Sequence, residues 1–218
     1  MSYSYDFPRP ALTVDIILYS YFKGTLQVLL IQRKEEPFAK KWALPGGFVE
    51  ENETAGEAAA RELKEETGYS DVVLSQLYTE TGLNRDPRGR TVSIVYRGFY
   101  VGTFQPQAGD DAAKAKWFSL YDLPELAFDH LKLIKKSYTR LKENIINKPF
   151  GKELLGSCFK LSDLKNIACK ILENEKTVDI LIHRMVDYNI IVQRDTKGCW
   201  HFDEIKYMWH SAFGFIRF

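Results

Sequence analysis

The chain has few of the residues that characterise secreted or membrane proteins. It holds three cysteines among 218 residues, and Cys158, Cys169 and Cys199 form no Cys-x-x-Cys pair and no Cys/His spacing typical of a zinc site. A set this sparse and odd in number predicts reduced thiols. The sequence shows no basic segment followed by an apolar stretch at its start, and no apolar run near the roughly 20 residues that span a bilayer. We therefore expect a cytoplasmic protein with no membrane partner.

The sequence also lacks an excess of either charge. Thirty Lys and Arg stand against 29 Asp and Glu, for a formal net charge of +1. This balance argues against a generally basic nucleic-acid-binding protein, although a local basic patch can be hidden in the average. Apolar side chains are abundant, at 45% of the residues, and 14% are aromatic. These suffice for one large domain, or for one domain and a smaller one.

Strand and helix patterns predict two domains, 1–150 and 151–218. β-branched and aromatic runs predict strands at residues 12–22, 26–34, 72–83, 91–102 and 114–120. Helical patterns over 55–67 and 130–147 interrupt and follow these strands, which indicates an α/β layered domain. The second helix is predicted to end at Pro149–Gly151, where we place the domain boundary.

The second predicted domain combines helices with a short β-ribbon. Its helices are expected at residues 152–158, 162–172 and 176–188. Ser162 is the expected N-cap of the middle helix. Two short strands are expected at residues 189–194 and 199–202. Three helices closed by a small β-ribbon are typical of a winged-helix-like domain.

The predicted helix over 55–67 has well-marked ends. Thr54 and Glu57 have the spacing of a capping box, in which each side chain can bond the backbone of the other residue. Gly68 suits the left-handed conformation that ends many helices.

Three glutamates crowd one side of this helix. At 100° per residue, Glu62, Glu65 and Glu66 span a single 100° sector. Taken alone, such a pattern is more typical of a solvated acidic face than of a site. The alternative is a site for a hard divalent cation, because clustered carboxylates repel one another unless a cation neutralises them, and Mg²⁺ prefers oxygen ligands.

The residues before the helix favour the cation site. Gly46 and Gly47 form a flexible turn whose carbonyls can approach an ion or a ligand. Glu53 and Arg61 are spaced to form an ion pair that ties this turn to the helix.

A longer pattern contains these residues at fixed spacing. In chain order it reads Gly47, five residues, Glu53, seven residues, Arg61-Glu62-Leu63, one residue, Glu65-Glu66, one residue, Gly68-Tyr69. This resembles the signature of the Nudix hydrolases at every charged and glycine position, and it departs only at Tyr69, where the family usually has an aliphatic residue. The resemblance implies a Nudix α/β/α sandwich that hydrolyses a nucleoside diphosphate linked to another group, here followed by the small C-terminal winged-helix-like domain.

The resemblance also assigns roles to residues of this chain. Glu62 and Glu66 match the principal metal ligands, Glu65 a further ligand or water activator, and Arg61 the residue that orients the cluster. The implied metal ligands are Glu62, Glu66, Glu65 and Gly46, and the implied catalytic residues are Arg61, Glu65 and Glu53. The implied cofactor is Mg²⁺, with Mn²⁺ as an alternative.

An arginine-rich loop between two predicted strands is a candidate substrate site. Arg85, Arg88 and Arg90 lie in the segment NRDPRGR at 84–90. They are either a solvated hairpin tip or guanidinium groups that pair with a diphosphate or a terminal ribose, and the sequence favours neither.

Other segments are similar to the ADP-ribose-binding branch of the family. These are Trp42–Gly47, Asp86–Arg90, Gly109–Ala112 and Phe128–His130. Trp42 is either a core residue or a support for adenine. Asp110 and Asp111 are either turn residues, or one of them supplies a late carboxylate to the metals or the water; we include Asp111 among the candidate substrate-binding residues. We expect His130 to start a helix rather than to act as a catalyst.

The same branch includes regulators in which a winged helix follows a Nudix domain that senses ADP-ribose. The candidate recognition helix, residues 173–188, has no cationic excess, and residues 151–218 contain ten Lys and Arg against nine Asp and Glu. The helix at 131–148 is more basic, which is more typical of a solvated face than of a DNA contact. Its basic residues are Lys132, Lys135, Lys136, Arg140, Lys142 and Lys148.

We therefore predict Mg²⁺-dependent hydrolysis of the pyrophosphate bond of a nucleoside diphosphate derivative, ADP-ribose to AMP and ribose 5-phosphate. The complete set of metal-site carboxylates favours this over the alternative, an ADP-ribose-sensing, DNA-binding transcriptional regulator of NAD or sugar metabolism. A third class is a binding module with neither activity. Branch membership also implies a homodimer, while DNA is a partner that we do not favour.

Overall fold

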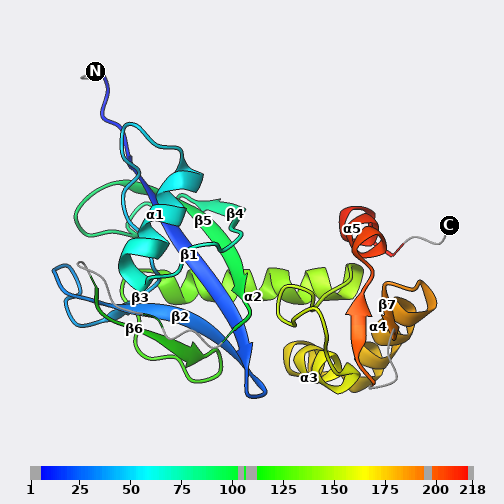
Figure 1. The fold of residues 1–218 in the computed structure, drawn as a ribbon. Coiled ribbons are helices and arrows are strands. Elements are labelled where there is room, and N and C mark those ends of the chain that lie inside the picture. Colours follow the sequence, from blue (N-terminus) through cyan, green and yellow to red (C-terminus); the bar gives the residue numbers. More distant parts are fainter. Residues whose placement is uncertain (1–5, 103–105, 107–111, 194–197, 216–218) are drawn as a thin grey trace. The chain divides into compact units, whose positions relative to one another are not determined.

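The computed structural model describes residues 6–102, 106, 112–193 and 198–215 (Figure 1). The chain forms two compact units. The first contains the described residues up to Leu18, then Val28–Gly98 and those from 106 to Ile134; the second contains Tyr19–Gln27, the described residues from Phe99, and those from Lys135 onwards. Within the described part, no helix is both long and apolar enough to cross a membrane. The domain ranges 1–150 and 151–218 stay a prediction.

All five predicted strands are present in one six-stranded sheet, together with one short strand that was not predicted. The strands are β1 (Ala11–Phe22), β2 (Thr25–Arg33), β3 (Trp42–Ala43), β4 (Ser75–Glu80), β5 (Thr91–Tyr100) and β6 (Ala112–Ser119). Their order is β3-β2-β1-β5-β4, and β6 pairs with β2. The β2–β3 and β4–β5 pairs are antiparallel.

The central strands are buried because they are apolar on both faces. Val14 and Ile16–Leu18 of β1 and Val28–Leu30 of β2 are at most 1% exposed. A continuous apolar run of this kind is expected where both faces of a sheet are covered. Helix α1 (Ala55–Thr67) contributes Ala58, Ala59 and Leu63 to the core. The alanines have no bulk beyond Cβ, so the helix backbone can lie close to its neighbours.

Helix α1 begins and ends where the sequence predicts. The Thr54 hydroxyl accepts a hydrogen bond from the Glu57 amide at 3.3 Å, and the Glu57 carboxylate accepts one from the Thr54 amide at 2.8 Å. Gly68 has a φ of 75°, and its amide donates to the Lys64 carbonyl. The capping box and the left-handed glycine are both confirmed.

Helix α2 (His130–Asn147) runs from the first unit into the second, which adds a helical pair, a two-stranded ribbon and a last helix. These elements are α3 (Leu161–Leu172), α4 (Glu175–Asp187), β7 (Ile191–Gln193), β8 (Trp200–Phe202) and α5 (Glu204–Phe213). Helices α3 and α4 pack together through their apolar faces. The ribbon pairs β7 and β8 antiparallel, as predicted.

Two predictions for this unit are wrong, and one helix was not predicted. Residues 152–158 form turns rather than a helix, since they follow Gly151, contain Gly156 and lead into a bridge between Phe159 and Trp200. Ser162 is not an N-cap, because α3 begins one residue earlier and Lys160 occupies the cap position without a side-chain hydrogen bond. Helix α5 was not predicted, although Asp203 caps it by accepting from the Lys206 amide at 3.0 Å.

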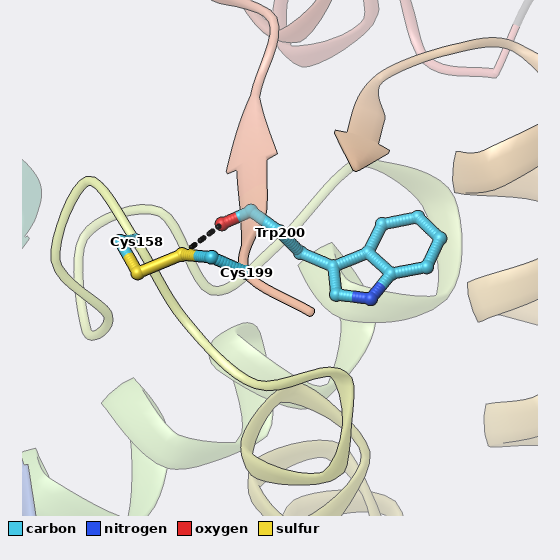
Figure 2. The surroundings of a disulfide bond; sticks show 3 residues. All are labelled: Cys158, Cys199 and Trp200. Carbon is cyan, nitrogen blue, oxygen red and sulfur yellow. Dashed lines mark hydrogen bonds between the residues drawn. A yellow bond between two sulfur atoms is a disulfide. The ribbon is translucent and has the colours of Figure 1, made fainter. Parts of the chain in front are cut away.

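The prediction of reduced thiols is wrong for two of the three cysteines. Cys158 and Cys199 form a disulfide across 41 residues of sequence, with their Cα atoms 5.6 Å apart (Figure 2). Each cysteine comes directly before a partner of the antiparallel bridge between Phe159 and Trp200, and this bridge brings the two Cα atoms within disulfide range. The sequence spacing contains no sign of that long-range pairing.

Candidate active site

Arg61 lies at the centre of the acidic face of α1. Its Nε and Nη2 donate to the two oxygens of Glu53 at 3.0 and 2.6 Å, so the predicted ion pair is present. Its Nη1 donates to Glu62 at 2.9 Å and to Glu65 at 3.1 Å. Nη2 also donates to the Phe48 carbonyl at 3.2 Å. The hydrogen bonds that Arg61 donates to Glu53 raise the pKa of Arg61 above its ordinary value, so this cation partly offsets the repulsion among the carboxylates.

The Gly46-Gly47 turn lies directly against two of these glutamates. Glu66, only 7% exposed, accepts a hydrogen bond from the Gly46 amide at 2.9 Å. Glu62 lies so close to Gly47 that a Cβ there would be 2.2 Å from Oε1. The turn is anchored to β1, since the Val14 amide donates to the Gly47 carbonyl at 2.9 Å.

The close contact between Gly47 and Glu62 predicts that a larger residue at position 47 lowers activity with little loss of stability. In Gly47→Ala the new methyl group would overlap the Glu62 carboxyl, a flexible side-chain end that can move aside. We expect kcat/KM for the hydrolysis predicted from the sequence to fall roughly 10- to 100-fold, because a displacement of about 1 Å at an active site can cost 10²-fold in rate. The control is Gly46→Ala, whose Cβ would lie 2.1 Å from the Val14 carbonyl oxygen at a φ of 150° and should destabilise the fold. Steady-state kinetics measure the activity of both variants, and thermal unfolding measures their stability. Full activity in Gly47→Ala would contradict the prediction.

The predicted metal ligands supply the donor types that a hard cation needs. Within the described residues, no three His, Cys, Asp or Glu side chains stand grouped as a metal site. Arg61 holds Glu62 and Glu65, while Glu66 bonds the Gly46 amide. Both Glu62 and Glu66 nevertheless border the same turn, and carboxylate and carbonyl oxygens are the ligands that Mg²⁺ and Mn²⁺ accept. These residues therefore fit a divalent metal ion.

A small pocket of about 50 Å³ opens beside the double-glycine turn, lined by Gly46, Gly47 and Phe48 among others. A larger cleft of about 690 Å³ shares Arg85, Asp86 and Phe128 with this pocket.

Two arginines give the pocket a cationic wall. Arg88 is held by Asp86 at 2.8 Å, and its guanidinium lies 5.2 Å from the Phe48 ring centre and 5.8 Å from that of Phe128. Arg33 also lies over Phe128, at 5.0 Å. Burial and then the charge of Arg88 lower the pKa of Arg33, whereas the hydrogen bonds to Asp86 raise the pKa of Arg88. The charge of Arg88 therefore disfavours the charged form of Arg33. A bound anion would relieve this repulsion.

The remaining predicted substrate residues have different surroundings. Arg85 lines both pockets with a side chain that is only 7% exposed, and it bonds Asp15 and Asp129 at 2.8 and 2.9 Å. Arg90 is exposed, lines the larger cleft, and donates to the Gly82 and Thr91 carbonyls at 2.9 Å. Trp42 packs edge-to-face on Phe118 at 4.6 Å and does not line either pocket. Asp110 and Asp111 lie outside the described residues.

Asp15 is a buried acid that the sequence prediction did not include. Its carboxylate accepts hydrogen bonds from Arg85 at 2.8 Å and from Ser93 at 2.6 Å, and His130 Nε2 lies 3.2 Å away. Burial alone would raise the pKa of Asp15, but His130, Arg85 and Ser93 outweigh it, so this pKa lies well below its ordinary value. The available sequence signal was a lone acid within an apolar strand, where an unpaired charge is costly.

His130 connects Asp15 to the double-glycine turn. The Leu44 amide donates to His130 Nδ1 at 2.8 Å. Since Nδ1 accepts, the ring proton lies on Nε2 and points to Asp15. Arg33 and Phe128 were likewise missed as pocket residues, because single positions at strand ends and in loops carry no periodic pattern.

Comparison with known proteins agrees with this geometry. The NUDIX domain family matches residues 9–138. An ADP-ribose pyrophosphatase of Methanocaldococcus jannaschii is 49% identical over 134 residues, which cover 62% of this chain and 76% of that protein. An ADPR responsive transcriptional repressor, NtrR, of Acinetobacter baylyi is 32% identical over 194 residues, 87% of this chain and 78% of the repressor.

A solved structure extends the similarity to nearly the whole chain. NrtR of Shewanella oneidensis, complexed with a 27mer DNA, has a TM-score of 0.74 and 27% identity, and covers 94% of this chain and 98% of its own. The fold and the acidic helix define a Nudix protein with an additional C-terminal region. The chain belongs to the NUDIX family.

Proposed function

We propose that this protein is a Nudix pyrophosphatase that hydrolyses ADP-ribose to AMP and ribose 5-phosphate with Mg²⁺ as cofactor. The observation that carries the proposal is the set of glutamates on α1, gathered around Arg61 and against the double-glycine turn. The 49% identity to an ADP-ribose pyrophosphatase supports the choice of substrate. Mn²⁺ is an alternative cofactor, because it accepts the same oxygen ligands.

The proposed reaction divides the work among these residues. Water attacks one phosphorus of the diphosphate and the bridging P–O bond breaks, which leaves one phosphate on each product. Glu62, Glu65, Glu66 and the Gly46 carbonyl would hold the metal ion. When bound, Mg²⁺ neutralises charge on phosphate oxygens and lowers the pKa of a water.

The remaining side chains orient the metal ligands and the substrate. Arg61 keeps Glu62 and Glu65 in place through its hydrogen bonds to them and to Glu53. Arg33 and Arg88 supply positive charge beside the turn, where they would bind the diphosphate. In this proposal Arg85 acts from the pocket wall by fixing Asp15 and Asp129.

A hydrolysis assay with purified protein tests the proposal. Incubation with ADP-ribose and Mg²⁺ is expected to release AMP and ribose 5-phosphate in equal amounts, and excess EDTA should stop the reaction. A panel of other nucleoside diphosphate derivatives determines whether ADP-ribose is preferred. Absence of turnover on ADP-ribose with both Mg²⁺ and Mn²⁺ would reject the proposal.

A second candidate is an ADP-ribose-responsive repressor. The observation that favours it is the similarity to NtrR and to a DNA-bound NrtR, because both matches extend beyond the family domain into the C-terminal region. The test is gel retardation of promoter DNA at physiological salt. Sequence-specific binding that ADP-ribose relieves would support the repressor, while salt-sensitive binding to any sequence would argue against it.

The proposal also covers the oligomeric state, the cellular location and the fold of the C-terminal region. We infer a homodimer in the cytoplasm, with residues 151–218 as a winged-helix-like domain. Size measurement by light scattering tests the dimer.

A further inference from the structure

We propose that His130 is a positioning residue, which fixes the double-glycine turn against the metal-binding helix through its Nδ1 atom. The inference rests on the proposed function, because the turn matters for catalysis only if the glutamates bind a metal ion. His130 is 5% exposed and starts α2, far in sequence from both the turn and α1.

The contact lies where β3 ends and the turn begins. The segment before α2 runs beside β3: Leu126 forms a parallel bridge with Trp42, and the Ala127 amide donates to the Trp42 carbonyl at 2.8 Å. Two residues after Trp42, at Leu44, the hydrogen bond across this pairing no longer joins two backbone groups. The Leu44 amide donates instead to His130 Nδ1 at 2.8 Å. The imidazole therefore continues the pairing of β3 to the first residue of the turn.

From Leu44 the turn leads directly to the glutamates. Pro45 has no amide proton, and its carbonyl accepts from the Ile16 amide at 2.8 Å. The next amide, that of Gly46, donates to Glu66 at 2.9 Å. Loss of the Leu44 anchor would free one end of this short segment, and with it the Gly46 amide that orients Glu66.

Asp15 keeps the imidazole in the tautomer that this role needs. Its carboxylate faces Nε2 at 3.2 Å, and Arg85 and Ser93 hold that carboxylate from other sides. With the proton on Nε2, Nδ1 is left as an acceptor for Leu44. The arrangement has the form of an orienting hydrogen-bond chain, from Asp15 through His130 to a backbone amide.

Two substitutions of His130 distinguish the contribution of Nδ1 from that of Nε2. In His130→Asn the side-chain oxygen can occupy the place of Nδ1 and accept from Leu44, while the bond to Asp15 is lost. In His130→Gln the terminal amide can occupy the place of Nε2 and donate to Asp15, while the acceptor for Leu44 is lost. Both variants should unfold at lower temperature, since each loses one buried hydrogen bond.

We expect ADP-ribose hydrolysis to distinguish them. The kcat of His130→Gln should fall about tenfold or more with KM within threefold, whereas His130→Asn should stay within about threefold of wild type. Ser137→Ala on the same helix is the matched control: it removes a buried hydrogen bond, from the Tyr19 hydroxyl, without touching Leu44 or Asp15, so kcat should be retained. Equal activity losses in His130→Asn and His130→Gln, per folded molecule, would overturn the proposal.

Hydrogen exchange in metal-free protein gives a readout that does not depend on turnover. The Leu44 and Gly46 amides should exchange slowly in wild type and in His130→Asn, and at least tenfold faster in His130→Gln. Should wild-type Leu44 exchange like an exposed loop amide, the proposal fails even if no variant folds. Failure of wild type to hydrolyse ADP-ribose, with protected amides, would instead reject the proposed function alone.

Discussion

Replacement of Glu66 by glutamine is expected to lower the kcat for ADP-ribose hydrolysis by roughly 10³-fold. Metal ligation contributes several kcal/mol to the stabilisation of transition-state charge, and each tenfold in rate corresponds to about 1.4 kcal/mol. Glutamine has nearly the same shape, and its oxygen can still accept from the Gly46 amide, so the buried side chain should keep its place. Steady-state kinetics at saturating Mg²⁺ measure the effect.

The control for Glu66→Gln lies on the same helix. Glu57→Gln makes the same chemical change in the first turn, where glutamine can replace glutamate in a capping box, so kcat should be unchanged. Calorimetry should show weaker Mg²⁺ binding in Glu66→Gln and similar ADP-ribose affinity without metal. Turnover within threefold of wild type in Glu66→Gln would contradict a metal-ligand role for Glu66.

Local sequence signals were sufficient to predict the acidic face of α1. Thr54, Glu57 and Gly68 act within one or two helical turns, so their spacing determines the helix ends without reference to the rest of the fold. The bonds from Arg61 to Glu53 and Glu65 follow from the same short spacing. A sequence pattern of fixed spacing around one helix was therefore enough to predict the acidic part of the candidate site.

The rest of the site depends on contacts between distant segments. Asp15, Arg85 and His130 come from a strand, a loop and the start of a helix, and only the sheet topology brings them together. Arg85 was predicted to lie either at a solvated hairpin tip or against the diphosphate or ribose of a substrate. The structure places it in the lining of both pockets and pairs its guanidinium with Asp15 and Asp129, a pairing that no local pattern reveals.

The C-terminal errors have the same origin. The Cys158–Cys199 disulfide depends on a bridge between Phe159 and Trp200, whose partners are 41 residues apart. The turns at 152–158 follow Gly151, contain Gly156 and lead into the same bridge, and the predicted helix ignored both the glycines and the bridge.

Asp15→Asn is expected to have the largest effect on stability. The asparagine removes the negative charge that faces Arg85 and His130, while the Arg85 side chain stays only 7% exposed. Removal of one partner from a buried ion pair typically costs about 3–5 kcal/mol, a large part of the 5–15 kcal/mol that stabilises an ordinary domain. Chemical denaturation at neutral pH measures the loss. Ser93→Ala, which deletes one neutral donor to the same carboxylate, should cost only about 1 kcal/mol.

The pH dependence of the stability loss in Asp15→Asn tests whether the Asp15 charge is its cause. The folded-state pKa of Asp15 lies below the unfolded value of about 4, so the stability that its ionisation contributes is present above that pH and is lost as pH falls. The difference in unfolding free energy between wild type and Asp15→Asn should therefore be constant from pH 5 to 7 and shrink towards pH 2. A difference that stays constant down to pH 2 would mean that hydrogen-bond geometry, rather than the Asp15 charge, holds Arg85 and His130 beside the active site.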